Sequence, residues 1–336
     1  MFTYIVRRLI GGVVMLIVVS FVTFLLFFSS GTNPAQYTCG KTCTPAIVEQ
    51  NSKVLGYNEP VIEQWGRFVQ GIAVGRDYPV DKSMIKDPNT IVHCSAPCLG
   101  YSPQLAQTVT QTLKPRIGVS ASLALAAFVM WMILGVGFGL VAAVRRGGLL
   151  DKTLVGVALM AYAMPTVVTA LVLYQFLVIK WQVFPTPEYV GITNNPASWF
   201  VGLLLPGLTL ALFYAGAYVR LTRAFILETL GQDFLRTAKA KGVAPRRILF
   251  KHTLRAALTP IVTQAGLDFG AVLGGAIITE NVFGYPGLGQ IAAQSAVTFD
   301  LPTTVGVVLI LATFVIIANL VVDVLYGFID PRVKLV

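Results

Sequence analysis

The chain has 336 residues, of which 55% are hydrophobic and only 12% are charged. A water-soluble domain carries about twice that charged fraction, so the composition excludes an ordinary soluble enzyme or binding module. The net charge of +10 is concentrated between long apolar runs, which indicates orientation in a membrane rather than nucleic-acid binding.

Six apolar runs are long enough to cross about 30 Å of hydrocarbon as helices. They lie near 9–29, 117–144, 154–179, 200–219, 261–279 and 304–327. Lipid offers no partner to an open sheet edge, and no ten-residue alternation is typical of a barrel, so we expect an all-α polytopic membrane protein. The expected parts are a first transmembrane helix (1–29), an extracytoplasmic loop (30–116) and a core membrane domain (117–330) with a cytoplasmic loop at 228–260.

The first run follows Arg7 and Arg8, as the apolar region of a signal peptide would. It is too long for such a region, and Ser-Ser-Gly-Thr-Asn follows it instead of a small-x-small cleavage site. We therefore interpret it as an uncleaved membrane anchor.

The loop at 30–116 contains all four cysteines, in two C-x3-C pairs: Cys39 with Cys43, and Cys94 with Cys98. This spacing differs from the usual zinc pattern, and an even number of cysteines outside the cytoplasm predicts two disulfides. Three pairings are possible, and the sequence does not choose between them. The stretch Ala35-x4-Gly40-Lys41-Thr42 matches a loose phosphate-loop pattern, but an apolar span precedes it where the motif needs a strand. We expect no nucleotide, metal or other cofactor on this chain.

Small residues and one proline mark how the spans pack. Gly266, Gly270 and Gly274 recur every fourth residue in the fifth run, as Gly135 and Gly139 do in the second. Such faces let helix backbones approach closely, either within this chain or against a second membrane subunit. In the third run, Pro165 predicts a kink.

Basic residues predict the orientation. They cluster at Arg7 and Arg8, between runs two and three, and densely over 220–260, where nine basic residues face only two acidic ones. Residues 180–199 carry one basic residue and 281–303 carry none. The rule that positive residues stay inside does not apply to loops as long as 30–116, so we expect both termini in the cytoplasm.

The cytoplasmic segment 228–260 predicts two helices joined by a tight turn. Asp233 suits the cap or first turn of the first helix, Gly242 suits a left-handed residue at its end, and Pro245 suits the start of the next helix. Small residues at Ala238 and Gly242 would let a partner approach closely.

At these residues the chain resembles a known family. Arg236-Thr-Ala-Lys-Ala-Lys-Gly242, with Pro260 eighteen residues after the glycine, resembles the "EAA" loop of ABC importer permeases, although Arg236-Thr237 replaces the usual Glu-Ala. Other stretches resemble the B-type subunit of dipeptide and oligopeptide permeases: Tyr4–Arg8, Leu55–Pro60, Gln64-Trp65, Arg145–Gly147, Leu221–Arg223, Glu280–Gly289 and Asp330–Arg332.

The resemblance implies a type I ABC importer permease fold and a channel-forming role in ATP-driven uptake of di- or oligopeptides. It implies a second homologous permease, two ATPase subunits that carry ATP and Mg, and an extracytoplasmic binding protein. It also implies a coupling helix in an ATPase groove, at Asp233, Arg236, Thr237, Ala238, Lys241, Gly242 and Val243. The family includes nickel and glutathione importers, so haem, glutathione or a nickel chelate are alternative cargoes.

Three polar residues in or directly after span five are candidates for the substrate path: Asp268, Glu280 and Asn281. An acid inside a membrane usually faces a cavity or a partner, so Asp268 would meet either the amino group of a peptide or an internal donor. A secondary carrier driven by an ion gradient is the competing function, and it would use Asp268 as its relay. No nucleophile and base are placed to suggest an enzyme.

Overall fold

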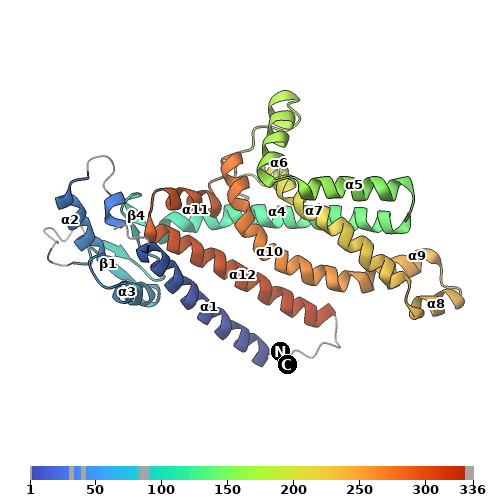
Figure 1. Ribbon diagram of the computed structural model, residues 1–336, viewed down its shortest axis with the longest axis horizontal. Coiled ribbons are helices and arrows are strands. Elements are labelled where there is room, and N and C mark those ends of the chain that lie inside the picture. The colour runs from blue at the N-terminus through green and yellow to red at the C-terminus, as the bar shows by residue number, and fades with distance from the viewer. Residues whose placement is uncertain (1, 30–33, 39–42, 82, 84–90, 330–336) are drawn as a thin grey trace. The chain divides into compact units, whose positions relative to one another are not determined.

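A computed structural model describes the chain except for residues 1, 30–33, 39–42, 82, 84–90 and 330–336. Its helices are α1 (Phe2–Ser29), η1 (Pro34–Tyr37), α2 (Pro45–Leu55), α3 (Val61–Val74), α4 (Val109–Val144), α5 (Leu149–Ala163), α6 (Thr166–Leu173), η5 (Tyr174–Lys180), α7 (Pro196–Leu230), α8 (Asp233–Ala240), α9 (Pro245–Arg247), η6 (Ile248–Leu254), α10 (Arg255–Phe283), α11 (Leu288–Val297) and α12 (Leu301–Ile329) (Figure 1). The short strands are β1 (Arg76–Tyr78), β2 (Val92–Cys94), β3 (Tyr101–Ser102) and β4 (Gln107–Thr108). The described residues divide into two compact units, one built on 119–285 and 315–336 and the other on 2–118 and 286–314.

The predicted all-α membrane architecture is confirmed. Within the described residues, four helices are long and apolar enough to cross a membrane: Tyr4–Phe27, Val109–Val144, Pro196–Leu230 and Leu301–Val324. Two bent pairs, Leu149–Ala163 with Thr166–Lys180 and Pro245–Val272 with Ala276–Phe283, bring the number to six if each pair is one span. Among the described residues, four of the six apolar runs therefore correspond to continuous helices and the other two to bent helix pairs.

The third run departs most from the expected single helix. Its two halves meet at an angle of 105°, so the kink predicted at Pro165 is a complete break (Figure 1). Met164 and Pro165 both leave the helical region, with ψ angles of 129° and 135°. Proline pushes the residue before it out of the α region and has no N–H of its own, which explains why the helix ends here.

The fourth run extends further than expected. Helix α7 continues through Arg220 and Arg223 to Leu230, so part of the stretch expected to be a cytoplasmic loop is helical. Asn195 caps its other end, with its side-chain oxygen accepting hydrogen bonds from the backbone N–H groups of Ala197 and Ser198 at 3.1 Å each.

The glycine faces pack within this chain. A Cβ at Gly135 would lie 2.4 Å from the Cβ of Tyr218, and one at Gly139 would lie 2.6 Å from the Cβ of Thr222, so α4 and α7 touch closely. A Cβ at Gly266 would lie 1.9 Å from Val322 of α12. At these positions the first of the two expected roles, packing inside the subunit, is observed. The side chain position of Gly274 lies outside the described part of the chain.

The second unit contains the folded part of the loop at 30–116. Phe24 of α1 and Phe68 of α3 form a core with Leu301, Val305 and Leu309 of α12. Two antiparallel pairs, β1 with β2 and β3 with β4, complete the loop. The folded part of this loop is therefore held by aromatic and aliphatic contacts to α1 and α12.

Candidate functional site

Helix α8 and the turn after it have the geometry predicted for the 228–260 segment. The backbone N–H of Gly242 donates to the carbonyl of Lys239 at 3.0 Å, and that of Val243 donates to the carbonyl of Ala238 at 3.2 Å. This pair of bonds is the Schellman arrangement, which needs a left-handed residue at Gly242. Its φ angle is 73°, as expected from the sequence. Pro245 then starts α9, also as expected.

The residues named as coupling candidates are mostly at the surface. Asp233, Arg236, Thr237, Lys241 and Gly242 are exposed. Of the other two, Ala238 and Val243 are half-buried. A Cβ added at Gly242 would meet nothing within 4 Å among the described residues, so no neighbour there explains the small residue. The surface of α8 is therefore open to a partner.

Helix α8 is fixed to the unit by one deep contact. Leu235 is fully buried, and α8 packs against the π-helical segment η6. Phe234, the preceding residue, is 45% exposed, so its aromatic ring lies at the surface while Leu235 is buried. An apolar cleft of about 760 Å³, lined by Leu227, Leu230 and Val243 among others, lies beside the helix.

A partly buried ion pair that was not predicted from the sequence holds the same end of this unit. Arg223 of α7 donates through Nε and Nη2 to the two carboxylate oxygens of Asp151, at 2.7 and 2.8 Å. Asp151 is only 4% exposed, and it also accepts a hydrogen bond from the backbone N–H of Gly147. The lone acid at the start of α5, beside Arg145-Arg146, was the signal that could have revealed it.

Asp268 is half-buried on α10, and both of its oxygens have donors from the same unit. The Tyr218 hydroxyl donates to Oδ2 at 2.7 Å, and Gln264 donates to Oδ1 at 3.2 Å. Tyr218 is itself buried beside Trp131, whose ring also stacks on that of Tyr214. The internal donors that we considered as one of the two roles of Asp268 are therefore present.

The other two substrate-path candidates lie further along α10. Glu280 is fully buried and accepts a hydrogen bond from the Ser120 hydroxyl at 2.5 Å. Asn281 is exposed and donates to the Ile277 carbonyl one turn earlier. The structure thus places the three candidates on one helix with different degrees of exposure.

The motif that follows these residues has a structural role. Gly284 ends α10 in a left-handed conformation, with a φ angle of 68°. The buried Tyr285 donates from its hydroxyl to the Gly202 carbonyl of α7 at 2.6 Å. Helix termination and packing within the unit therefore explain the residue types at part of the Glu280–Gly289 stretch.

In the loop at 30–116, Cys94 and Cys98 form a disulfide and are both buried beside Tyr78. Cys43 is also disulfide-bonded, whereas Cys39 lies outside the described residues. The structure therefore pairs Cys94 with Cys98, within the second C-x3-C pair, where the sequence left the pairing open. Residues 40–42 of the phosphate-loop-like stretch lie outside the described residues as well.

Apolar helices long enough to span a membrane, together with a short surface helix between two of them, define a multi-pass membrane protein. The chain belongs to the family of binding-protein-dependent transport system inner membrane components, whose model matches residues 135–335. The model for the N-terminal part of such components matches residues 1–124.

Similar proteins extend over nearly the whole chain. A probable peptide ABC transporter permease protein, y4tP of Sinorhizobium fredii, is 31% identical over 331 residues, covering 98% of this chain and 99% of its own length. The dipeptide transport system permease protein DppB of Escherichia coli K12 is 30% identical and covers 99% of both chains.

The solved structures show the same fold. A chain of the MetNI methionine ABC transporter in an inward-facing conformation has a TM-score of 0.54 at 17% identity. The match covers 66% of this chain and 97% of that one. The predicted ABC importer permease fold is confirmed, and the chain is a multi-pass inner-membrane transport subunit.

Proposed function

We propose that this chain is one of two channel-forming permeases in an ATP-driven importer of di- and oligopeptides. One observation carries the proposal. Helix α8 is anchored to its unit and exposes its surface to a partner, in a chain that belongs to the binding-protein-dependent family. The cargo is inferred from the names of the relatives, a peptide permease and a dipeptide permease. Haem, glutathione and nickel chelates remain the alternative cargoes.

Energy for transport comes, in this proposal, from two partner ATPase subunits that bind ATP and Mg. Helix α8 sits in a groove of one ATPase, where Asp233, Arg236, Thr237 and Lys241 provide exposed polar contacts. Closure of the ATPase pair moves α8, and the buried Leu235 passes the motion to η6 and α10. This is gating between two states, and no bond is made or broken by this chain.

The distribution of charge within the first unit supports an orientation with α8 in the cytoplasm. The ion pair between Asp151 and Arg223 places the start of α5 beside the last turns of α7. The basic residues Arg145 and Arg146 therefore lie at the same end of this unit as the basic segment that follows α7. Both termini then lie in the cytoplasm and the loop at 30–116 lies outside, where a binding protein delivers its cargo.

Co-purification tests the assembly. The tagged chain, expressed with its genomic neighbours and solubilised in mild detergent, should retain a second permease and an ATPase with two copies per complex. Mass spectrometry of the ligand held by the binding protein should then identify short peptides. A chain that purifies alone and carries out transport alone would favour the secondary carrier, with Asp268 as its ion relay.

A further inference from the structure

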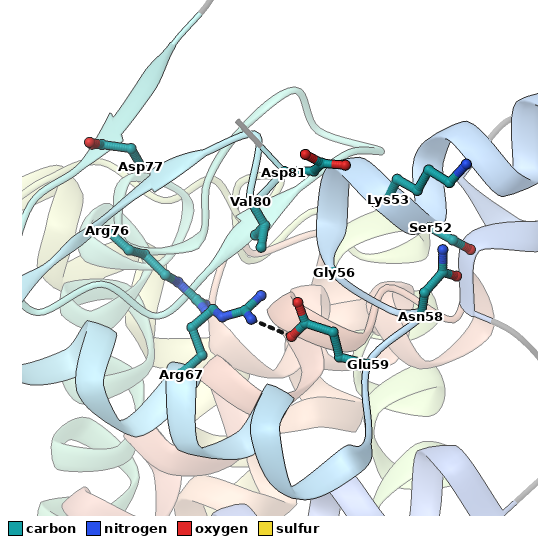
Figure 2. Close-up of a pocket in the computed structure, with 10 residues that line it drawn as sticks. All are labelled: Ser52, Lys53, Gly56, Asn58, Glu59, Arg67, Arg76, Asp77, Val80 and Asp81. Atoms are coloured by element: carbon teal, nitrogen blue, oxygen red, sulfur yellow. Dashed lines mark hydrogen bonds and ion pairs between the residues drawn. The ribbon is translucent and has the colours of Figure 1, made fainter. Parts of the chain in front are cut away.

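Two of the cavities in this chain differ in their balance of charge. The one in the loop at 30–116 lies between α2, α3 and β1 and has a volume of about 480 Å³ (Figure 2). Basic and acidic side chains line it in equal number: Lys53, Arg67 and Arg76, with Glu59, Asp77 and Asp81. The other, a cleft of about 580 Å³ between α5 and α7, is lined by two arginines and, among the described residues, by no acid. This second cleft is therefore suited to an anionic ligand.

Arg220 of α7 supplies the free charge of the cleft. It is exposed, and no carboxylate or other acceptor pairs with it in the part of the chain that the structure describes. Arg223 also lines the cleft, but its guanidinium is held by both carboxylate oxygens of Asp151. The other acid of α5 and α7, Glu228, does not line the cleft. The charge of Arg220 is thus not compensated within the cleft.

The remaining lining is apolar or aromatic. It comes from one face of each helix, namely Val155 and Tyr162 of α5 and Ala217, Leu221 and Ala224 of α7. The two backbones touch beside the cleft, since a Cβ at Gly216 would lie 2.4 Å from the carbonyl oxygen of Ala158. The cleft is therefore a groove between two packed helices, with apolar walls and a cationic end.

Helix length places the two ends of this groove at different depths in a membrane. Arg220 stands 24 residues after Pro196, the first residue of α7, which corresponds to about 36 Å along the helix. The hydrocarbon layer is about 30 Å thick, so Arg220 lies at headgroup level on the side where α7 ends. Tyr162 is 11 residues from Asp151 along α5, or about 17 Å farther into the apolar layer. The groove therefore extends over the depth of about one leaflet.

The cationic end favours an anionic headgroup over a zwitterionic one. Lys152 is exposed on α5, one turn before Val155 on the same face, and it adds positive charge at that end. Arginine binds phosphate oxygens through a planar pair of donors, and basic pockets between membrane helices take the headgroups of anionic lipids. The ammonium of a zwitterionic headgroup would be repelled by Lys152.

We propose that the cleft between α5 and α7 binds one anionic phospholipid, with its phosphate on Arg220 and its acyl chains along Val155 and Tyr162. Exposed apolar side chains continue this surface on α5, where Leu159 is 45% and Met160 is 69% exposed. The orientation proposed above assigns the lipid to the inner leaflet. Apart from the leaflet, the inference depends neither on the cargo nor on the energy source of transport.

The experiment is native mass spectrometry of the full-length chain in a mild non-ionic detergent, titrated with dioleoyl phosphatidylglycerol or dioleoyl phosphatidylcholine. One phosphatidylglycerol should bind tightly, and phosphatidylcholine should bind at least about ten-fold more weakly. Arg220→Gln should weaken phosphatidylglycerol binding by about ten-fold or more, the loss expected for charge-assisted hydrogen bonds. Inorganic phosphate should not displace the lipid, because it lacks the acyl chains that the apolar walls hold.

Arg246→Gln is the matched control for charge. It removes an arginine from an exposed position of α9 that does not line the cleft, and it should bind the lipid as the original chain does. Val155→Trp fills the cleft without removing a charge and should also weaken binding. Its control is Val157→Trp, at a residue that is 65% exposed on the same helix and lies outside the cleft lining, which should leave binding unchanged. The melting temperature of each variant checks that it has folded.

Four results would overturn the proposal. Equal affinity for the two lipids, or displacement by inorganic phosphate, would show that the cleft does not select an anionic lipid. Unchanged binding by folded Arg220→Gln, or equal weakening by Arg246→Gln, would show that the lipid binds elsewhere or through overall charge. Loss of the lipid when the chain assembles with a second permease would count equally against it, because the cleft would then hold the partner chain.

Discussion

Replacing Gly242 by valine tests the role of α8 most sharply. The turn requires a φ angle of 73°, a conformation that costs a residue with a side chain about 1–2 kcal/mol. Nothing lies within 4 Å of the position that a Cβ would occupy, so no clash inside the chain adds to that cost. A penalty of this size reduces the population of the native turn by roughly 5- to 30-fold relative to alternatives.

The membrane helices should tolerate the change, because Leu235 remains buried and the turn is exposed. We expect Gly242→Val to insert and assemble, while peptide-stimulated ATP hydrolysis and peptide uptake by the reconstituted complex both fall at least about ten-fold. Peptide binding by the separate binding protein should not change. Uptake and hydrolysis are measured in liposomes with the partner subunits present.

Gly147→Val is the matched control. Gly147 has a φ angle of 79° in the turn between α4 and α5, and it too has open space around its Cβ position. The backbone penalty is therefore similar, but the position is outside α8. If both variants lost coupling equally, backbone strain in either turn would be sufficient to explain the loss. That result would refute a specific role for the turn at Gly242.

Three further results are expected. For topology, a cysteine introduced at Ala240 should resist an impermeant thiol reagent added to intact cells, and one at Val190 should react. Labelling of position 240 from outside would show that the chain has the opposite orientation. For the thiols, mass mapping without reductant should show Cys94 joined to Cys98 and no free thiol at Cys39 or Cys43, and stoichiometric alkylation of any of the four would contradict this. For the ion pair between Asp151 and Arg223, Asp151→Asn should lower the melting temperature in detergent, since it leaves the Arg223 guanidinium with a neutral partner. Asp233→Asn on the exposed surface of α8 is the control, and equal melting temperatures for the two variants would contradict a stabilising role for the pair.

Hydropathy revealed the membrane spans because lipid accepts only long apolar segments whose backbone groups are satisfied internally. It could not reveal the break at Pro165. Apolar residues continue on both sides, and proline restricts its neighbour without setting the angle between the two helices. The 105° bend depends on how each half packs.

The turn at Gly242 was predictable because a helix end has a local signature. A glycine after a good helix former, with a proline soon after it, specifies the turn without reference to the rest of the chain. The pair of Asp151 and Arg223 was not predictable in this way, since 72 residues separate its partners.

Asp268 shows how a structure narrows a choice that the sequence leaves open. A single acidic residue in an apolar helix suggests an ion relay or a substrate-binding group. The sequence alone does not show which residue donates a hydrogen bond to it. Tyr218 lies 50 residues away in the sequence, yet its hydroxyl donates to the carboxylate. This contact supports a structural role for Asp268 and weakens the secondary-carrier alternative.

The source of energy for uptake is the most direct test of the account. The chain, its permease partner and the binding protein are reconstituted into liposomes with or without the ATPase subunits, and radiolabelled dipeptide uptake is measured with ATP or with an imposed proton gradient. The account predicts uptake only when the ATPase subunits and ATP are present, with no response to the gradient. Uptake by this chain alone, driven by the proton gradient and abolished by Asp268→Asn, would contradict it.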